Sequence, residues 1–124
     1  MPGIVILFCF VALSATEAVR AYEPDLDAIA ATGADALLLT AAGEEGSGAD
    51  YVLRVFGPNV GIPEDPATGS AQCVAGPYWA TQLGRDELVA RQLSPRGARF
   101  EVRPEADRVR IAGHATTVLT GNLC

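Results

Sequence analysis

The feature that most constrains this fold is a glycine- and proline-rich segment that leads directly into a single long helix candidate. Residues Gly57 to Thr68 hold three prolines and two glycines, which predicts a long irregular loop. Loops of this length in small domains usually carry function. Gly69 to Leu83 then has the apolar content of a helix, and Gly84 is a natural stop. Pro77 lies inside this helix, where it removes one backbone hydrogen bond.

Short apolar runs separated by turn residues surround this helix and predict strands. Two short helices are expected at Glu17–Ala21, capped by Ser14 or Thr16, and at Asp25–Thr32, ended by Gly33. The expected strands are Ala36–Thr40, Tyr51–Phe56, Arg91–Leu93, Arg99–Arg103, Arg108–Ala112 and Thr116–Leu119. The late strands are joined by short turns, which favours antiparallel pairing. The sequence therefore predicts one α+β domain over residues 1–124, with a curved, mostly antiparallel sheet wrapped around a central helix.

The first fourteen residues are atypical because Ile4 to Leu13 form a continuous apolar run. The run is too short to cross a bilayer as a helix, which needs about 20 residues. Its β-branched and aromatic residues favour a buried strand. A secretory signal segment or a misassigned start are the alternatives, although no basic residue precedes the run.

Charge and cysteine content narrow the function classes. The net charge is −6, which argues against nucleic-acid binding because that requires a basic face. No membrane association is expected either. Three cysteines without CxxC spacing favour neither a disulfide framework nor a metal site, and indicate a reduced, cytoplasmic setting. Cys73 is predicted to be buried. Arginines gather late in the chain and are predicted to line the solvent side of strands: Arg96, Arg99, Arg103, Arg108 and Arg110.

Residues 61–71, which read GIPEDPATGSA, are the segment best suited to chemistry. The first N–H groups of a helix lack intrahelical partners and can bind a carboxylate or phosphate. Thr68 and Ser70 add hydroxyl donors, and Asp65 either caps the helix or acts as an ionisable group in the site. An ordinary helix entry, with aspartate as cap and Pro66 in the first turn, remains the alternative. His114, the single histidine, is expected to be structural and to lie in a late strand.

The run Ile62 to Ala71 resembles the signature of the PhzF (phenazine biosynthesis-like) isomerase family. Arg54 to Pro58 before it, and Cys73 to Ala80 after it, fit the same pattern. The resemblance extends over about Ser14 to Leu123. It implies half of a fold similar to diaminopimelate epimerase, in which two such domains enclose an active site between them.

The resemblance also implies cofactor-independent proton transfer next to the carboxylate of a small metabolite. By position, Asp65 would face the reacting centre, and Gly69 and Ser70, with Thr68 and Ala71 beside them, would hold the substrate carboxylate. The family's main acid/base glutamate belongs to an N-terminal domain that this sequence lacks, and Glu64 is not that residue. The expected partners are that missing domain or a split partner chain, and a homodimer is possible. A non-catalytic remnant or interaction module that retains a small-anion pocket is the alternative, and a small secreted domain is a third interpretation.

Overall fold

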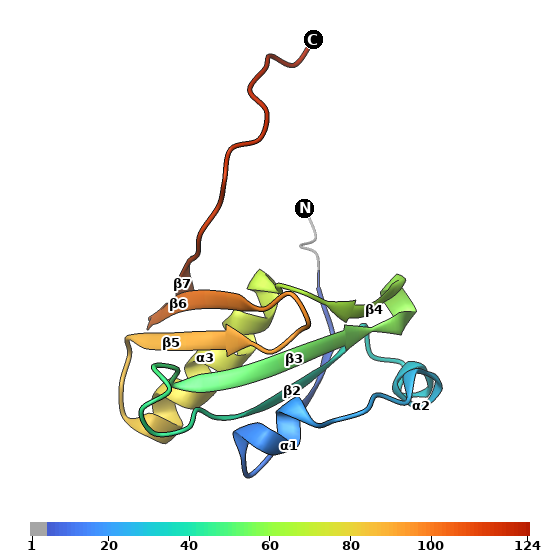
Figure 1. Cartoon of the computed structure of the whole chain (residues 1–124), viewed down its shortest axis with the longest axis vertical. Coiled ribbons are helices and arrows are strands. Elements are labelled where there is room, and N and C mark those ends of the chain that lie inside the picture. The colour runs from blue at the N-terminus through green and yellow to red at the C-terminus, as the bar shows by residue number, and fades with distance from the viewer. Residues whose placement is uncertain (1–4) are drawn as a thin grey trace.

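The computed structural model describes residues 5–124 as one sheet with helices on both of its faces (Figure 1). The strands run in the order β1–β2–β3–β5–β6–β7, and β4 pairs with β3 beside this path. The β1–β2 and β3–β5 pairings are parallel, and the others are antiparallel. The predicted α+β class is therefore confirmed. The strands are β1 Phe8–Ala12, β2 Ala36–Ala42, β3 Tyr51–Gly57, β4 Ile62–Asp65, β5 Leu88–Gln92, β6 Ala98–Glu105 and β7 Arg108–Ala112.

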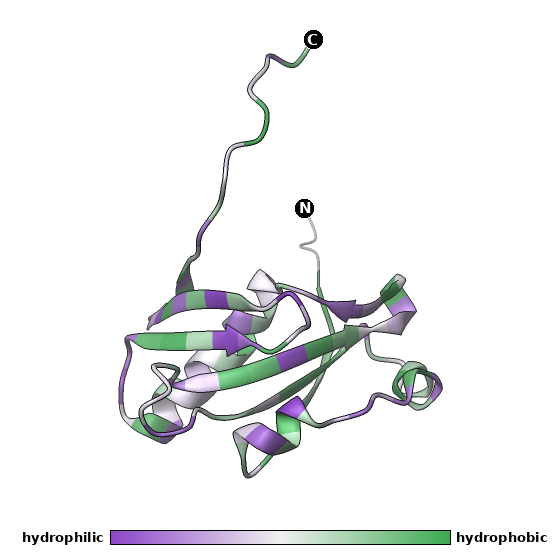
Figure 2. Ribbon diagram, viewed as in Figure 1, coloured by the Kyte–Doolittle hydropathy of each residue, from purple (hydrophilic) through white to green (hydrophobic). Residues whose placement is uncertain are grey.

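The long helix α3, Gly69–Leu83, forms the centre of the main core. Its bounds are those predicted, and Gly84 ends it in the left-handed conformation with φ +66°. Ala71 and Ala75 are fully buried and let the helix pack closely on the sheet. Trp79 donates its indole N–H to the Thr40 hydroxyl at 3.0 Å, so this large aromatic ring enters the core without an unpaired polar atom. Figure 2 shows the matching apolar strands, with β2 and β3 largely green.

The short helices α1, Thr16–Arg20, and α2, Leu26–Ala31, pack against β3. They bury Val19 and Ile29 in two smaller apolar clusters. The Asp25 carboxylate accepts a bond from the Ala28 N–H at 3.0 Å and so caps α2. The predicted Ser14 or Thr16 cap of α1 is wrong. The helix starts after Ala15 without a side-chain cap, because the Thr16 hydroxyl donates instead to the Ala42 carbonyl at 2.8 Å.

The segment between β3 and α3 is more regular than its glycines and prolines indicate. It contains a 3-10 turn, η1 Pro58–Val60, and the strand β4, so the prediction of an irregular loop throughout is wrong. The prolines are tolerated there because β4 pairs only with β3 and leaves its other edge free of ladder bonds among residues 5–124. The high glycine and proline content of this segment therefore did not predict the short edge strand that forms there.

Two predictions for the C-terminal region are also wrong. Residues 113–124 form no strand and extend away from the domain (Figure 1). The expected strand at Thr116–Leu119 has no neighbour to pair with in the described part of the chain, and a strand needs such a neighbour. His114 lies in this exposed segment rather than in a strand.

The prediction that Cys73 is buried is wrong as well. Cys73 is exposed on α3, because the buried face of that helix is formed by residues such as Ala71 and Ala75.

The apolar start forms β1, as predicted, but the strand is only half-buried because it lies at the edge of the sheet. It pairs with β2 alone, so one of its edges has no neighbouring strand among residues 5–124. Ile4 lies outside the described residues. Within residues 5–124 no helix has the length and apolar character needed to span a membrane. The late arginines that were predicted to face solvent are all exposed.

Candidate functional site

The turn between β4 and α3 brings the predicted site residues together. Asp65 ends β4, and Thr68 occupies the N-cap position of α3 with an extended backbone, φ −115° and ψ 101°. The Asp65 carboxylate accepts hydrogen bonds from the Thr68 hydroxyl at 2.6 Å and from the Ala67 N–H at 3.4 Å. Asp65 therefore closes the turn on itself and does not cap α3. Within the described chain, no side chain caps the first turn of this helix, whose N–H groups can then bind an external acceptor.

Gln92, at the end of β5, holds this turn from behind. Its amide oxygen accepts from the Thr68 N–H at 2.8 Å. Its amide N–H groups donate to the Asp65 carbonyl at 2.7 Å and to the Thr68 hydroxyl at 3.0 Å. Only 1% of Gln92 is exposed, so these bonds form away from water and hold the turn in one conformation.

Two further polar side chains support the turn. The Ser94 hydroxyl donates to the Pro66 carbonyl at 2.9 Å. Gln72 donates to the Thr68 carbonyl at 3.2 Å and accepts from the Tyr51 hydroxyl at 2.6 Å. Burial raises the pKa of Tyr51 well above its usual range, and the nearby charge of Asp50 raises it further. The phenol is therefore a neutral donor, and the chain from Tyr51 to Thr68 fixes the first turn of α3.

A cavity of about 360 Å³ opens beside this turn. Its polar side is formed by Asp35, Asp65, Thr68 and Ser70. The Asp35 carboxylate already accepts a bond from the Leu7 N–H at 2.8 Å. The remaining wall is apolar and comes from β1, β2, β3, β4 and the segments beside them: Val5, Ile6, Phe8, Ala36, Val55, Gly57, Val60 and Ile62. A few polar groups converging in an apolar hollow are typical of a small-molecule site.

The predicted residues take different positions in this site. Asp65, Thr68 and Ser70 line the cavity, and the Ser70 side chain is exposed. Gly69 lies in the first turn of α3, exposed at the surface. The side chain of Ala71 is fully buried in the core, so only its backbone can take part in binding. Sequence reasoning gave no role to Gln72, Gln92 or Ser94. The signal in the sequence for Gln72 and Gln92 was a polar residue at an inward position of a helix or strand, whereas Ser94 lies in the bend after β5 and carried no such signal.

Glu64, next to Asp65, is occupied elsewhere. Its carboxylate oxygens accept from Arg54 at 3.0 and 2.9 Å in a two-point ion pair. Arg54 also donates to the carbonyls of Val19 and Tyr22, so the pair ties α1 to the sheet. Glu64 is a structural residue in this chain. Among residues 5–124, no three His, Cys, Asp or Glu side chains gather as metal ligands would.

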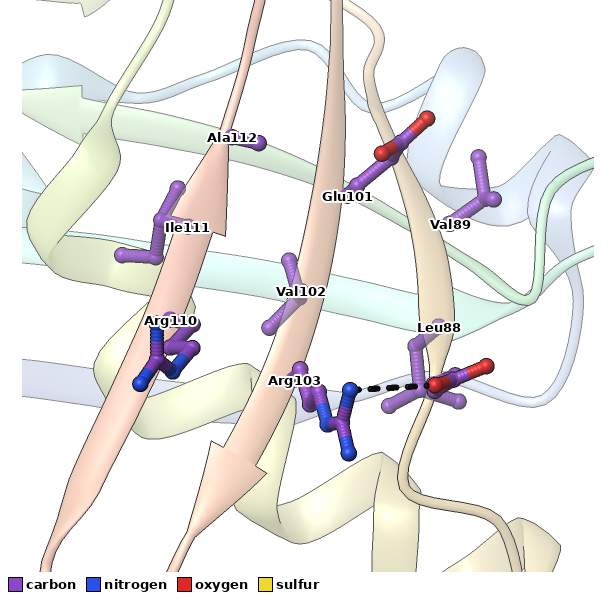
Figure 3. A pocket seen from close by; sticks show the side chains of 9 residues that line it. Leu88, Val89, Glu101, Val102, Arg103, Arg110, Ile111 and Ala112 are labelled. Carbon is purple, nitrogen blue, oxygen red and sulfur yellow. Dashed lines mark ion pairs between the residues drawn. The ribbon is translucent and has the colours of Figure 1, made fainter.

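A larger hollow, about 690 Å³, lies elsewhere, over β5, β6 and β7 (Figure 3). It contains none of the predicted site residues, and charged side chains line it: Glu87, Glu101, Arg103 and Arg110. Size alone does not select the functional site here. The smaller cavity instead brings together an uncapped helix turn, a hydroxyl and a carboxylate, a combination typical of binding and catalytic sites.

The chain matches the family described as phenazine biosynthesis-like protein (PhzC-PhzF) over residues 6–121, and it belongs to that family. It is 44% identical over 113 residues to an uncharacterised isomerase of Pseudomonas aeruginosa, covering 91% of this chain and 42% of that protein. It is 41% identical to the mouse phenazine biosynthesis-like domain-containing protein 2, covering 86% of this chain and 39% of that protein.

Solved structures agree with this assignment. A PhzC/PhzF protein of Clostridium difficile matches with a TM-score of 0.81 at 32% identity, over 94% of this chain and 44% of that one. A PhzF family protein of Enterococcus faecalis matches with a TM-score of 0.78 at 36% identity, over 84% and 39% of the two chains. The chain thus spans less than half the length of the relatives it matches. The family resemblance inferred from the motif is confirmed.

Proposed function

We propose that this chain forms the carboxylate-binding half of a PhzF-like isomerase, which moves a proton next to the carboxylate of a small metabolite. The observation that carries the proposal is the uncapped first turn of α3 opening into an apolar cavity beside Asp65. The free N–H groups and the positive end of the helix favour an anion there. The Ser70 hydroxyl adds a donor on the same wall.

Asp65 is the candidate for proton chemistry within this chain. It lies on the cavity wall, and the Thr68 hydroxyl and Ala67 N–H hold its carboxylate in one orientation. A group that takes and returns a proton must be held at a fixed distance from the reacting atom. The resemblance assigns the main acid/base glutamate to the half of the relatives that this chain does not cover. Asp65 would then act as the second group of the site or position the substrate.

A titration of the 124-residue chain with sodium acetate, followed by NMR of the backbone amides, tests the binding part of this proposal. We expect saturable shifts centred on residues 68–71, weakened in Ser70→Ala because a donor is lost. Asp65→Asn should tighten binding, since the negative charge beside the pocket opposes an anion. Ser14→Ala, an exposed serine outside the cavity, is the matched control and should bind like the parent chain. Shifts that cluster elsewhere and omit residues 68–71 would contradict the site.

Catalysis needs a separate test, because the proposal assigns one essential group to the other half. The 124-residue chain alone should show no measurable turnover, since one positioned general base contributes roughly 10²–10⁴-fold. A chimera that joins the N-terminal part of the Pseudomonas aeruginosa relative to this chain should exchange a substrate proton with deuterated water. Mass spectrometry of candidate carboxylates detects that exchange. Robust exchange by the isolated chain would refute the division of roles.

The second candidate function is a non-catalytic module that only binds small anions. It is favoured by one observation: the free helix turn, Ser70 and the apolar wall all belong to this chain. The chimera separates the two candidates. Acetate binding at residues 68–71 without deuterium exchange in the chimera would support the binding module.

A further inference from the structure

The outer face of β5, β6 and β7 collects most of the positive charge of an acidic chain. The net charge is −6, yet six of the nine positively charged side chains lie between residues 91 and 110. On the other face of these strands, Leu88, Ala90 and Val102 join the core around α3. Five of these six arginines lie on the strands, alternate with inward-facing residues and are exposed, whereas Arg96 lies in the connection between β5 and β6. α1 and α2 pack on β2 and β3, which leaves this charged face accessible (Figure 1).

The strand register places arginines directly opposite one another on this face. Arg91 faces Arg99 across β5 and β6, and Arg103 faces Arg110 across β6 and β7. Like charges directly opposite in an antiparallel pair are destabilising. The sheet therefore holds two unfavourable pairs, and only one of them is well compensated.

Carboxylates offset the repulsion between Arg103 and Arg110, the second pair. Arg103 forms an ion pair with Glu87 at 3.3 Å (dashed line in Figure 3). It forms a second ion pair with Glu105 at 3.4 Å. Arg110 pairs with Glu105 at 2.7 Å. At the first pair, Arg99 reaches Glu101 at 3.1 Å, and Arg91 has no ion-pair partner among residues 5–124. Positive charge at Arg91 and Arg99 is thus only partly balanced within the described chain.

A hollow of about 500 Å³ lies at this first pair. Its charged lining residues are Arg91, Arg99 and Arg20, which arrives from the end of α1. None of the described residues that line it is acidic. Arg20 has its own partners outside the hollow, Glu17 at 2.6 Å and Glu44 at 3.8 Å. Three arginines and no acidic residue therefore line the hollow, and Arg91 is the one of the three without an ion-pair partner among residues 5–124.

We propose that this hollow, lined by Arg20, Arg91 and Arg99, is a binding site for a phosphoryl group of a small, multiply charged anion. Guanidinium groups form paired hydrogen bonds with carboxylates and phosphates alike. A phosphoryl group has three acceptor oxygens and a carboxylate has two, so a phosphoryl group can bridge two guanidinium groups more readily. The anion would also relieve the repulsion between Arg91 and Arg99. The site is distinct from the cavity at Ser70, with which it shares no lining residue.

The hollow lies beside residues that hold the turn of the candidate active site. Gln92 and Ser94 contribute to its lining, and their side chains hold the turn from Asp65 to Thr68. An anion bound at Arg91 would lie next to the strand end that fixes this turn. We expect its binding to shift the amide signals of residues 65–68 as well as those of residues 91–99.

Calorimetric titration of the whole chain with inorganic pyrophosphate tests the proposal. We expect saturable binding that weakens as salt rises, because screening reduces charge attraction. Arg91→Gln and Arg99→Gln should each weaken binding roughly tenfold, the order expected for one charge-assisted hydrogen bond. Arg103→Gln, on the same face but paired with carboxylates, is the matched control and should change the affinity less than about twofold. Citrate should bind at least about tenfold more weakly than pyrophosphate if guanidinium–phosphate geometry decides.

Three results would overturn the proposal: no saturable binding, an equal loss in Arg103→Gln, or equal affinity for citrate. A concentration-dependent dimer that Arg91→Gln dissociates, without pyrophosphate binding, would show instead that this face joins two copies of the chain. Circular dichroism of each variant checks its fold. Arg91→Gln removes a like-charge contact and should melt no lower than the parent at low salt. Acetate shifts at residues 68–71 should persist in Arg91→Gln, which separates this site from the proposed active site.

Discussion

Replacing Gln92 by leucine tests whether a buried side chain of β5 holds the candidate active-site turn. Leucine has nearly the same size, so the change removes hydrogen bonds without opening a large cavity. Three bonds are lost, two to Thr68 and one to the Asp65 carbonyl. The Thr68 hydroxyl keeps its bond to the Asp65 carboxylate. The Thr68 N–H and the Asp65 carbonyl are left without a partner in a position that water reaches poorly, since Gln92 is 1% exposed.

The expected loss of stability follows from these two orphaned groups. A buried donor or acceptor without a partner costs about 1–3 kcal/mol. Two such groups give roughly 2–6 kcal/mol, and the added apolar contact of leucine offsets part of this. We therefore expect Gln92→Leu to lower the free energy of unfolding by about 2–4 kcal/mol, a large part of the ~5–15 kcal/mol typical of a domain.

Urea denaturation, followed by the fluorescence of Trp79, the single tryptophan, measures this loss. Arg91→Gln is the matched control, because Arg91 precedes Gln92 on the same strand but faces solvent. That variant should change stability by no more than about 0.5 kcal/mol. In Gln92→Leu the amide signals of residues 65–71 should also shift or broaden. A stability loss below about 1 kcal/mol, with those signals unchanged, would refute the role assigned to Gln92.

Three further predictions concern the core and the surface. Gly76→Ala should destabilise the chain, because an added Cβ would lie 2.7 Å from a Val102 methyl and overpacking costs about 1–3 kcal/mol, against a helix-propensity gain of ~1 kcal/mol. In urea denaturation, adding Val102→Ala should restore stability to Gly76→Ala, and a Gly76→Ala variant more stable than the parent would contradict the close contact. Because the folded-state pKa of Tyr51 is raised, its contribution to stability is fully present below the unfolded pKa near ~10 and is lost above it, at up to about 1.4 kcal/mol per pH unit. Denaturation at alkaline pH should show this fall in the parent and a weaker one in Tyr51→Phe, and equal slopes would count against it. Cys73 and Cys124 are exposed and Cys9 is half-buried, so mass spectrometry after brief alkylation should find the first two modified ahead of Cys9, and the reverse order would argue against the orientation of α3.

The sequence alone was sufficient to predict features that depend on residues close together along the chain. The bounds of α3 follow from its apolar pattern and from Gly84, which adopts the left-handed conformation that ends a helix. The helix predicted at Asp25–Thr32 forms as α2, Leu26–Ala31. Residues 61–71 were predicted to carry the candidate site because a turn and a helix start are local features too. The motif that carries the family resemblance lies in this same stretch, and the match over residues 6–121 confirmed the family.

Tertiary structure decided whatever depends on residues distant in the sequence. Gln92 lies 24 residues from Thr68, and only the alignment of β5 with the turn shows that the two are bonded. Arg99 was predicted to face solvent, and only the strand register shows that it lies opposite Arg91. The segment Thr116–Leu119 has the composition of a strand, yet it forms none without a neighbouring strand to pair with. The physical reason is that strand pairing, register and burial arise between segments, whereas helix ends and turns are settled within a few residues of the chain.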